Sequence, residues 1–249
     1  MDSKEFALHA ALEDSHWWFT GRRTVLADIL RRFVPPAAGR LLAEIGCGTG
    51  GNLKSLRSDY RVIGCDKAHD AVAHARQRVD CPVFEGDFSE VFAPYSHEID
   101  AILLLDVLEH IEDDALFMGR IVDFLQPGGI LFMTVPAHMA LWSSHDESLG
   151  HKRRYGAEEL KNLWKHLQVD TLFFSPINSI LFPLIALYRI LGFGGGGGGK
   201  SNLKESPHLI NRFLYHVFAI ERYWLKRRVL PFGGSYCAVL RKRGVEIVD

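Results

Sequence analysis

The sequence predicts an α/β domain with a parallel sheet whose two faces are both covered by helices. Apolar runs of strand length alternate with segments of helical periodicity through the first two thirds of the chain. These runs are almost continuously apolar, which is typical of strands that are buried on both faces. The first of them leads into a glycine-rich loop and then into a helix-compatible segment, as in strand–loop–helix units of such sheets.

Seven strands are expected along the chain. Their ranges are Arg40–Ile45, Arg61–Cys65, Pro82–Glu85, Ile99–Leu105, Ile130–Val135, Val169–Ser175 and Ser235–Arg241. Helical segments between them include Ala68–Val79 and Asp113–Phe124, and a Pro-Gly-Gly turn precedes the fifth strand. The length of 249 residues suits one domain, 1–249, with a single buried core.

A long insertion, 176–234, separates the last two predicted strands. It comprises the apolar run Ile177–Phe193, the glycine tract Gly194–Gly199 and a helical stretch Leu209–Arg228. The glycine tract is expected to be flexible. A membrane-spanning helix needs about 20 apolar residues, and the apolar run is shorter. We therefore expect a short helix broken by Pro183, and no transmembrane span.

Composition narrows the classes of partner and compartment. The formal net charge is −1, so no overall field attracts nucleic acid, and nucleic acid is not an expected partner. The cysteines Cys47, Cys65, Cys81 and Cys237 are scattered along the chain, which favours reduced thiols and a cytoplasmic location. Acidic residues interrupt the N-terminal segment where a signal peptide needs an apolar run.

The strongest local signal is the glycine-rich loop within Leu41–Gly51. Its glycines let backbone N–H groups approach a ligand closely. Asp66 ends the next strand, where a carboxylate can accept hydrogen bonds from ribose hydroxyls. Gly46, Gly48 and Gly51 also satisfy the G-x-G-x-x-G fingerprint of dinucleotide-binding folds. From these residues alone the cofactor contains adenosine, and its identity stays open.

The whole pattern from Leu41 to Pro136 resembles the class I S-adenosylmethionine-dependent methyltransferases of the bacterial type 11 group. The matching segments are E-I-G-C-G-T-G at 44–50, G-D-F at 86–88, L-D-V-L-E-H at 105–110 and L-Q-P-G-G at 125–129. The resemblance implies a Rossmann-like sheet of seven strands, mostly parallel, with the last strand antiparallel. The alternatives are an NAD(P)-dependent oxidoreductase, for which no suitable Tyr-x-x-x-Lys pair exists, and a catalytically inactive cofactor-binding scaffold.

The resemblance also implies a set of cofactor-binding residues. Glu44 stands where the family has an acid near the methionyl moiety, and Asp66 matches the ribose-binding acid. Asp87 matches the aspartate that meets the adenine amino group, with Phe88 covering the ring. The expected cofactor-binding residues are Glu44, Gly46, Cys47, Gly48, Gly50, Asp66, Lys67, Asp87, Phe88 and Asp106.

A first cluster of reactive side chains, Asp106, Glu109 and His110, follows the fourth strand. If a helical turn begins there, the three side chains share one face and could bind a divalent cation. A similar D/E-x-x-E-H segment in the quinone-biosynthesis O-methyltransferases is associated with a metal. The alternative, which we favour, is that an acid caps the turn and His110 lines the cofactor pocket, with no metal bound.

A second cluster lies in 136–155, after the fifth strand. It resembles the L-W-S-x-H-D…G-H-x-R-R-Y stretch of related bacterial methyltransferases, and three histidines suit a substrate-binding loop. A hydroxyl acceptor needs a general base, and the candidates are His145 first, then His151, then His110. The alternative is a solvated loop whose Arg153 and Arg154 pair with nearby acids.

Two further segments have open roles. The N-terminal part, 1–38, carries H-W-W-F-T-G-R-R at 16–23 and is expected to form a helical lid, although its aromatic residues could equally pack into the core. The segments 177–193 and 221–228 could contact a membrane surface peripherally, or form a substrate lid or a dimer contact. The expected acceptor is a small molecule, a lipid or a lipid-linked glycan.

Overall fold

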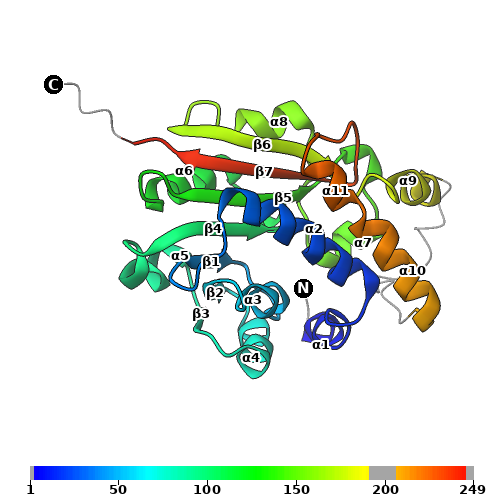
Figure 1. Cartoon of the computed structure of the whole chain (residues 1–249), viewed down its shortest axis with the longest axis horizontal. Helices are drawn as coiled ribbons and strands as arrows, with labels where there is room; N and C mark the ends of the chain where they lie inside the picture. Colours follow the sequence, from blue (N-terminus) through cyan, green and yellow to red (C-terminus); the bar gives the residue numbers. More distant parts are fainter. Residues whose placement is uncertain (1–2, 191–205, 245–249) are drawn as a thin grey trace.

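The computed structural model describes residues 3–190 and 206–244. Its centre is a seven-stranded sheet in the order β3-β2-β1-β4-β5-β7-β6, shown in Figure 1. The strands are β1 (Leu41–Ile45), β2 (Arg61–Asp66), β3 (Val83–Glu85), β4 (Ile99–Leu105), β5 (Ile130–Pro136), β6 (Val169–Ile177) and β7 (Ser235–Lys242). β7 lies antiparallel between β5 and β6, and the other pairs are parallel. The predicted strands and the antiparallel last strand are confirmed.

Helices connect these strands and precede the first of them. They are α1 (Ser3–Leu12), α2 (Trp17–Phe33), α3 (Gly51–Leu56), α4 (His69–Arg78), α5 (Phe88–Val91), α6 (Asp114–Phe124), α7 (Ser144–Leu149), α8 (Ala157–Asn162), α9 (Phe182–Ile190), α10 (His208–Ala219) and α11 (Glu221–Leu225). Short 3₁₀ turns occur at Ala93–Tyr95, Leu108–His110 and Met139–Leu141. The helices predicted at 68–79 and 113–124 are α4 and α6.

The sheet has a hydrophobic core on each face. Successive residues of a strand point to opposite faces, so Leu42 packs into one core and Ala43 into the other. The first core also contains residues of α2, α3, α4, α10 and α11, and the second contains residues of α5, α6 and α8. Helices therefore cover both faces, as predicted. The four cysteines carry no disulfide.

The N-terminal segment divides into two helices with different surroundings. α2 places Val25, Leu26, Ile29 and Leu30 in the first core. α1 instead packs against α4, beside the glycine-rich loop. The core-packing interpretation therefore fits α2, and a lid role within 1–38 remains a prediction for α1.

The insertion is anchored to the sheet through one buried carboxylate. Glu221 of α11 is 0% exposed and accepts hydrogen bonds from the backbone N–H groups of Asn178 (2.7 Å) and Ile180 (2.8 Å). This contact joins the end of β6 to α11. Burial raises the pKa of Glu221.

Two details of the insertion differ from the sequence prediction. Pro183 does not break a helix, because α9 begins at Phe182 and Pro183 occupies its first turn, where a missing N–H costs nothing. The predicted stretch 209–228 forms two successive helices, α10 and α11. The glycine tract at 194–199 lies outside the described residues. Within the described ranges, every helix is too short or too polar to cross a bilayer.

Candidate active site and cofactor site

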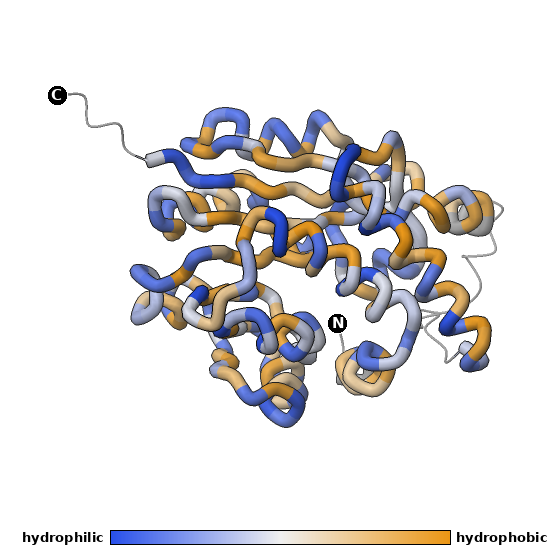
Figure 2. Tube along the Cα trace, viewed as in Figure 1, coloured by the Kyte–Doolittle hydropathy of each residue, from blue (hydrophilic) through white to orange (hydrophobic). Residues whose placement is uncertain are grey.

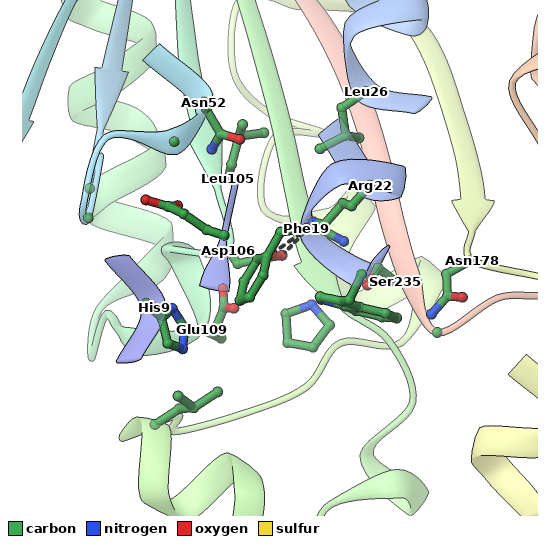
Figure 3. Close-up of a pocket in the computed structure, with 18 of the residues that line it drawn as sticks. His9, Phe19, Arg22, Leu26, Asn52, Leu105, Asp106, Glu109, Asn178 and Ser235 are labelled. Carbon is green, nitrogen blue, oxygen red and sulfur yellow. Dashed lines mark hydrogen bonds and ion pairs between the residues drawn. The ribbon is translucent and has the colours of Figure 1, made fainter. Parts of the chain in front are cut away.

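A cavity of about 350 Å³ lies at the carboxyl ends of β1, β4 and β5. This edge of an open α/β sheet is where such folds bind ligands. Figure 3 shows side chains from α1, α2, the loop after β4 and the insertion converging on it. One cavity therefore joins the glycine-rich loop to the histidine-containing loop after β5.

Seven of the residues predicted from the sequence line this cavity. They are Gly46, Cys47, Gly48, Asp106, His110, His145 and His151. The lining does not include the predicted residues Glu44, Gly50, Asp66, Lys67, Asp87 and Phe88. Lining residues that the sequence did not single out include His9, Asn52, Asn178 and Ser235, which come from separate segments of the chain and share no motif.

The glycine-rich loop needs its glycines for conformation and for space. Gly46 and Gly48 have φ angles of 70° and 54°, in the left-handed region that favours glycine. A Cβ atom on Gly46 would lie 2.5 Å from Cγ2 of Val107. A Cβ atom on Gly48 would meet nothing within 4 Å, so the backbone there is open to a ligand.

Asp66 is held at the end of β2 by backbone donors. Its carboxylate accepts hydrogen bonds from Gly48 N (3.0 Å) and Ala68 N (2.9 Å). The same carboxylate thus fixes the glycine-rich loop and stands beside it. Asp66 does not line the cavity itself, and its contact with a ribose remains a prediction.

Glu44 is a buried acid with one unpartnered oxygen. It is 1% exposed and accepts a hydrogen bond from Asn52 Nδ2 at 2.7 Å, while Oε2 has no partner among the described residues. Burial raises the pKa of Glu44 to about 8, with the Asp66 charge adding to the effect. Glu44 does not line the cavity, but its partner Asn52 does, so the unpartnered oxygen is a candidate acceptor for a cationic group of a ligand bound next to Asn52.

Asp87 and Phe88 directly follow β3, the strand that pairs with β2, and Asp87 caps α5. Burial raises the pKa of Asp87, but hydrogen bonds from Ser89 and Arg120 outweigh it and lower the value to about 2. Lys67 Nζ lies 3.3 Å from the same carboxylate. Phe88 is 2% exposed and its ring packs in the second core. The adenine contacts of Asp87 and Phe88 remain predictions.

Asp106 forms an ion pair that the sequence did not indicate. Its carboxylate lies 2.6 Å from the guanidinium of Arg22 on α2, and Arg22 is 8% exposed (Figure 3). Thr134 Oγ1 accepts a further hydrogen bond from Arg22. Asp106 has a positive φ of 56°, so no regular helical turn begins there. The expectation that Asp106 shares a helical face with Glu109 and His110 is therefore wrong.

His151 is oriented by a buried carboxylate. Its Nδ1 lies 3.0 Å from Oδ1 of Asp146, which is 0% exposed and also pairs with Arg154 at 2.7 Å. Backbone and hydroxyl groups of Ser143 bond the second oxygen of Asp146. Arg154 is 6% exposed, and Arg153 pairs with Asp114 at 2.8 Å. The expected pairing of Arg153 and Arg154 with acids is therefore confirmed, but the pair that Arg154 forms is buried and not solvated.

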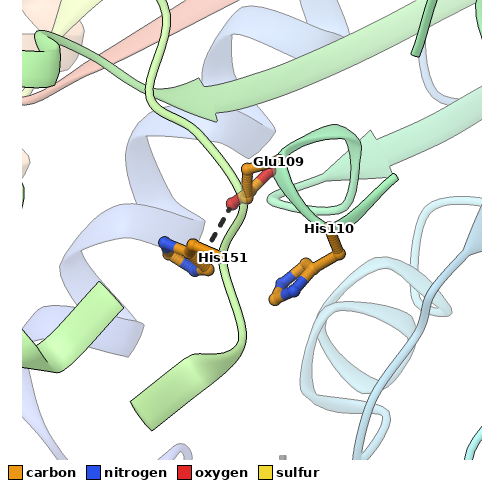
Figure 4. Close-up of side chains that lie close together, drawn as sticks. All are labelled: Glu109, His110 and His151. Carbon is orange, nitrogen blue, oxygen red and sulfur yellow. Dashed lines mark ion pairs between the residues drawn. The ribbon is translucent and has the colours of Figure 1, made fainter. Parts of the chain in front are cut away.

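Glu109 and His110 complete the group around His151. Nε2 of His151 lies 3.8 Å from Oε1 of Glu109, and the His110 and His151 rings are 4.8 Å apart (Figure 4). His110 Nδ1 contacts the carbonyl oxygen of Gly150. Burial raises the pKa of Glu109 well above its usual value, helped by the Asp106 charge, while burial and then His151 lower the pKa of His110.

The structure changes the group that could hold a metal. One ligand atom from each of Glu109, His110 and His151 lies within 4.8 Å of the others. Asp106 is not in this group, because Arg22 binds it. A divalent cation would therefore need His151 as a ligand, and it would compete with any role of that imidazole as a base.

His145, the first base candidate from the sequence, lies on α7 and lines the same cavity. It is half-buried. His9 of α1 lines the cavity too, and burial and then the His145 charge lower the pKa of His9 to about 4. His151, by contrast, lies between Glu109 and the buried Asp146.

The strand order, the antiparallel β7, and the glycine-rich loop followed by the acid of β2 define the fold of class I S-adenosylmethionine-dependent methyltransferases. A family model described as a methyltransferase domain matches residues 18–172. The chain belongs to this methyltransferase family.

Named relatives agree with this assignment. The chain is 31% identical over 157 residues to a protein named probable S-adenosylmethionine-dependent methyltransferase from Mycolicibacterium smegmatis, covering 61% of this chain and 59% of that protein. It is 33% identical over 101 residues to a ubiquinone biosynthesis O-methyltransferase from Ruegeria pomeroyi, covering 38% and 40%. The matched region spans less than two thirds of each relative. S-adenosylmethionine, and not NAD(P), is the cofactor that the family supports.

Solved structures share the fold. The complex between the Haloferax volcanii Trm112 methyltransferase activator and a methyltransferase matches with a TM-score of 0.60 and 18% identity, covering 97% of this chain and 95% of that chain. Phosphoethanolamine N-methyltransferase 2 from Haemonchus contortus matches with a TM-score of 0.53 and 18% identity, covering 88% and 52%. At these identities the matches show the architecture alone.

Proposed function

We propose that the protein transfers a methyl group from S-adenosylmethionine to a hydroxyl of a small molecule, a lipid or a lipid-linked glycan. One observation carries this proposal: the glycine-rich loop and the Asp146–His151 pair line the same cavity. The first provides a cofactor site, and the second provides an oriented imidazole. Hydroxyl acceptors need a base, because methylation of a neutral alcohol leaves a proton to be removed.

His151 is the base that the contacts favour. The carboxylate of Asp146, already paired with Arg154, accepts a hydrogen bond from Nδ1–H of His151. Nε2 is then unprotonated and faces the cavity beside Glu109. As the acceptor proton moves to Nε2, the buried Asp146 carboxylate stabilises the imidazolium that forms. His145 remains the second candidate.

The cofactor site is proposed to use the residues around the loop. S-adenosylmethionine, when bound, supplies a methyl group activated by its sulfonium. The open backbone at Gly48 would accommodate the cofactor, Asp66 would accept hydrogen bonds from its ribose, and Glu44 would face its ammonium. Alignment of the acceptor oxygen with the methyl group is then the main task of the cavity walls.

Calorimetric titration tests the cofactor assignment. We expect S-adenosylhomocysteine to bind with micromolar affinity and NADH to give no heat of binding. NADH binding alone would overturn the proposal. Transfer of a radioactive methyl group to lipid or glycan extracts then tests catalysis, and a protein that binds the cofactor but methylates none of these acceptors would support the inactive-scaffold alternative.

The raised pKa of Glu44 predicts that cofactor binding depends on pH. Its pKa of about 8 means that the free protein keeps this carboxyl protonated at neutral pH. A bound ammonium favours the carboxylate, so binding releases a proton, and affinity for S-adenosylhomocysteine should rise from pH 6 to 8 by up to about tenfold per unit. Calorimetry in buffers of different ionisation enthalpy measures the release. E44Q should abolish it, and release that persists in E44Q would assign the proton to another group.

Metal chelation separates the two possible roles of His151. We expect activity to survive dialysis against EDTA, because a base needs the free Nε2 that a metal would occupy. The measurement is methyl transfer before and after dialysis, with Zn²⁺, Mn²⁺ and Mg²⁺ added back separately. If activity is lost and one ion restores it, Glu109, His110 and His151 form a metal site, and His151 is not the general base.

We also propose that α1 acts as the lid. His9 of α1 lines the cavity, and Glu13, just after α1, contacts Thr49 of the glycine-rich loop and Arg78 of α4. Removing 1–13 takes away both His9 and Glu13 and leaves α2 in the core, so this truncation should stay folded and lose cofactor affinity. A folded truncation that binds S-adenosylhomocysteine like the full chain would exclude a lid.

A further inference from the structure

Exposed apolar side chains gather on the insertion. Ten of the twelve large apolar side chains that are exposed in the described part of the chain lie between Leu184 and Phe232. They are Leu184, Leu187, Leu209, Ile210, Phe213, Ile220, Tyr223, Trp224, Val229 and Phe232. Figure 2 shows the hydrophobic colouring along α9 and α10 at the edge of the molecule. Such a concentration on one segment marks an interaction surface.

Helical geometry places part of this set on one stripe. Ile220, between α10 and α11, has φ −64° and ψ −25°, so the helical conformation continues from one helix into the next. Leu209, Phe213, Ile220 and Trp224 are spaced by 4, 7 and 4 residues, which brings them to the same side. We call this set the outer stripe.

The opposite side of the same helices faces the protein. Phe218 is 0% and Leu225 is 1% exposed, and both belong to the first core. α10 and α11 pack on α2, as Figure 1 shows. These helices therefore have two apolar sides: one is buried in the core, and the other is the exposed outer stripe. Packing against the core explains the first side but does not explain the outer stripe.

Basic side chains predominate around the outer stripe. Arg212, Arg227 and Arg228 are exposed, and so is Lys226, whose ammonium lies 3.3 Å from the carboxylate of Asp28 on α2. Within the described residues of 178–234 the carboxylate of Glu221 is the only one, and it is 0% exposed and bound to backbone N–H groups. The surface is thus apolar, aromatic and cationic together, with no exposed acid in its described part.

An anionic lipid surface matches each of these properties. Apolar side chains enter the boundary between headgroups and acyl chains, exposed Trp and Tyr prefer that boundary, and basic side chains attract anionic headgroups. A second copy of the chain fits less well, because a twofold contact through this surface would bring the same cations together. Since no described helix can span a bilayer, the contact would be peripheral.

We infer that the outer stripe and its basic neighbours bind the surface of an anionic membrane, and that the acceptor is an amphiphile drawn from that surface. The insertion connects the two sites, because Asn178, Phe182 and Gly234, near its two ends, line the cavity. An acceptor leaving the membrane interface would reach the cavity along this segment. The membrane contact stands by itself, whereas the acceptor class rests on the proposed function.

Vesicle co-sedimentation of the full chain tests the membrane contact. We expect binding to vesicles of phosphatidylcholine with phosphatidylglycerol, weakening in high salt, and little binding to pure phosphatidylcholine. The double variants F213S/W224S and R227Q/R228Q should each weaken binding by about tenfold or more. The matched controls L116S and K165Q, which change exposed residues of α6 and of the segment after α8, should bind like the unchanged protein.

The alternatives give distinct results. Failure to bind anionic vesicles, or equal binding by the double variants, overturns the inference. Dimerisation in solution that F213S/W224S abolishes would assign the outer stripe to a second copy instead. Because this assay uses neither cofactor nor turnover, its outcome is independent of the proposed function. Unchanged S-adenosylhomocysteine affinity or an unchanged melting curve shows that each variant is folded.

Discussion

H151Q is expected to lower the turnover number for a hydroxyl acceptor by about 100-fold to 10,000-fold, the usual contribution of a general base. Glutamine can keep the hydrogen bond to Asp146 but cannot take up a proton at neutral pH. Affinity for S-adenosylhomocysteine should remain close to that of the unchanged protein. Single-turnover methyl transfer and calorimetry measure the two quantities separately.

H145Q is the matched control, since both histidines line the cavity. The preference for His151 rests on its pair with the buried Asp146, so replacement of His145 should change turnover less than H151Q does. A larger loss of turnover in H145Q would indicate that His145 is the base, as the sequence analysis predicted. Equal and small losses in both variants would indicate an acceptor, such as an amine or a carbanion, that needs no base.

Asp66→Ala should weaken binding of S-adenosylhomocysteine by about 100-fold or more. The variant loses the hydrogen bonds that ribose hydroxyls would donate to a carboxylate, each worth about 1.5–3 kcal/mol. It also leaves the N–H groups of Gly48 and Ala68 without their acceptor, so the glycine-rich loop loses its support. Calorimetry measures the affinity, and circular dichroism shows whether the variant is folded.

Asp80→Ala provides the comparison for this change. Asp80 is exposed in the turn after α4 and does not line the cavity. It should bind S-adenosylhomocysteine like the unchanged protein. If Asp66→Ala folds and binds equally well, the ribose contact must come from another residue.

Local patterns predicted the sheet well, for a physical reason. A strand buried on both faces needs a continuous apolar run, so β4, for example, begins and ends at the predicted residues Ile99 and Leu105. The glycine-rich loop could also be predicted from the sequence, because left-handed φ angles such as that of Gly46 favour glycine. These signals lie within one segment of the chain.

Contacts between distant segments could not be predicted in this way. Nothing near Asp106 in the sequence indicates that Arg22 of α2 binds it, and this ion pair removes Asp106 from the group around Glu109. The preference for His151 over His145 likewise comes from the folded position of Asp146. The prediction that Pro183 breaks a helix was wrong because proline is also favoured in the first turn of a helix, which is where Pro183 lies in α9.

The register of the last two strands has a consequence for how this protein can change. Ile177 and Ser235 are partners in the β6–β7 pair, so the insertion leaves the sheet and returns to it at neighbouring points. The free energy needed to close such a loop grows only with the logarithm of its length. Exchange of 178–234 for a segment of another length would leave the hydrogen bonds of the sheet in place, provided that the new segment again buries apolar side chains where Phe218 and Leu225 pack against α2. On the proposed function, evolution can therefore vary the choice of acceptor through this insertion, while the segments that handle the methyl donor stay constant.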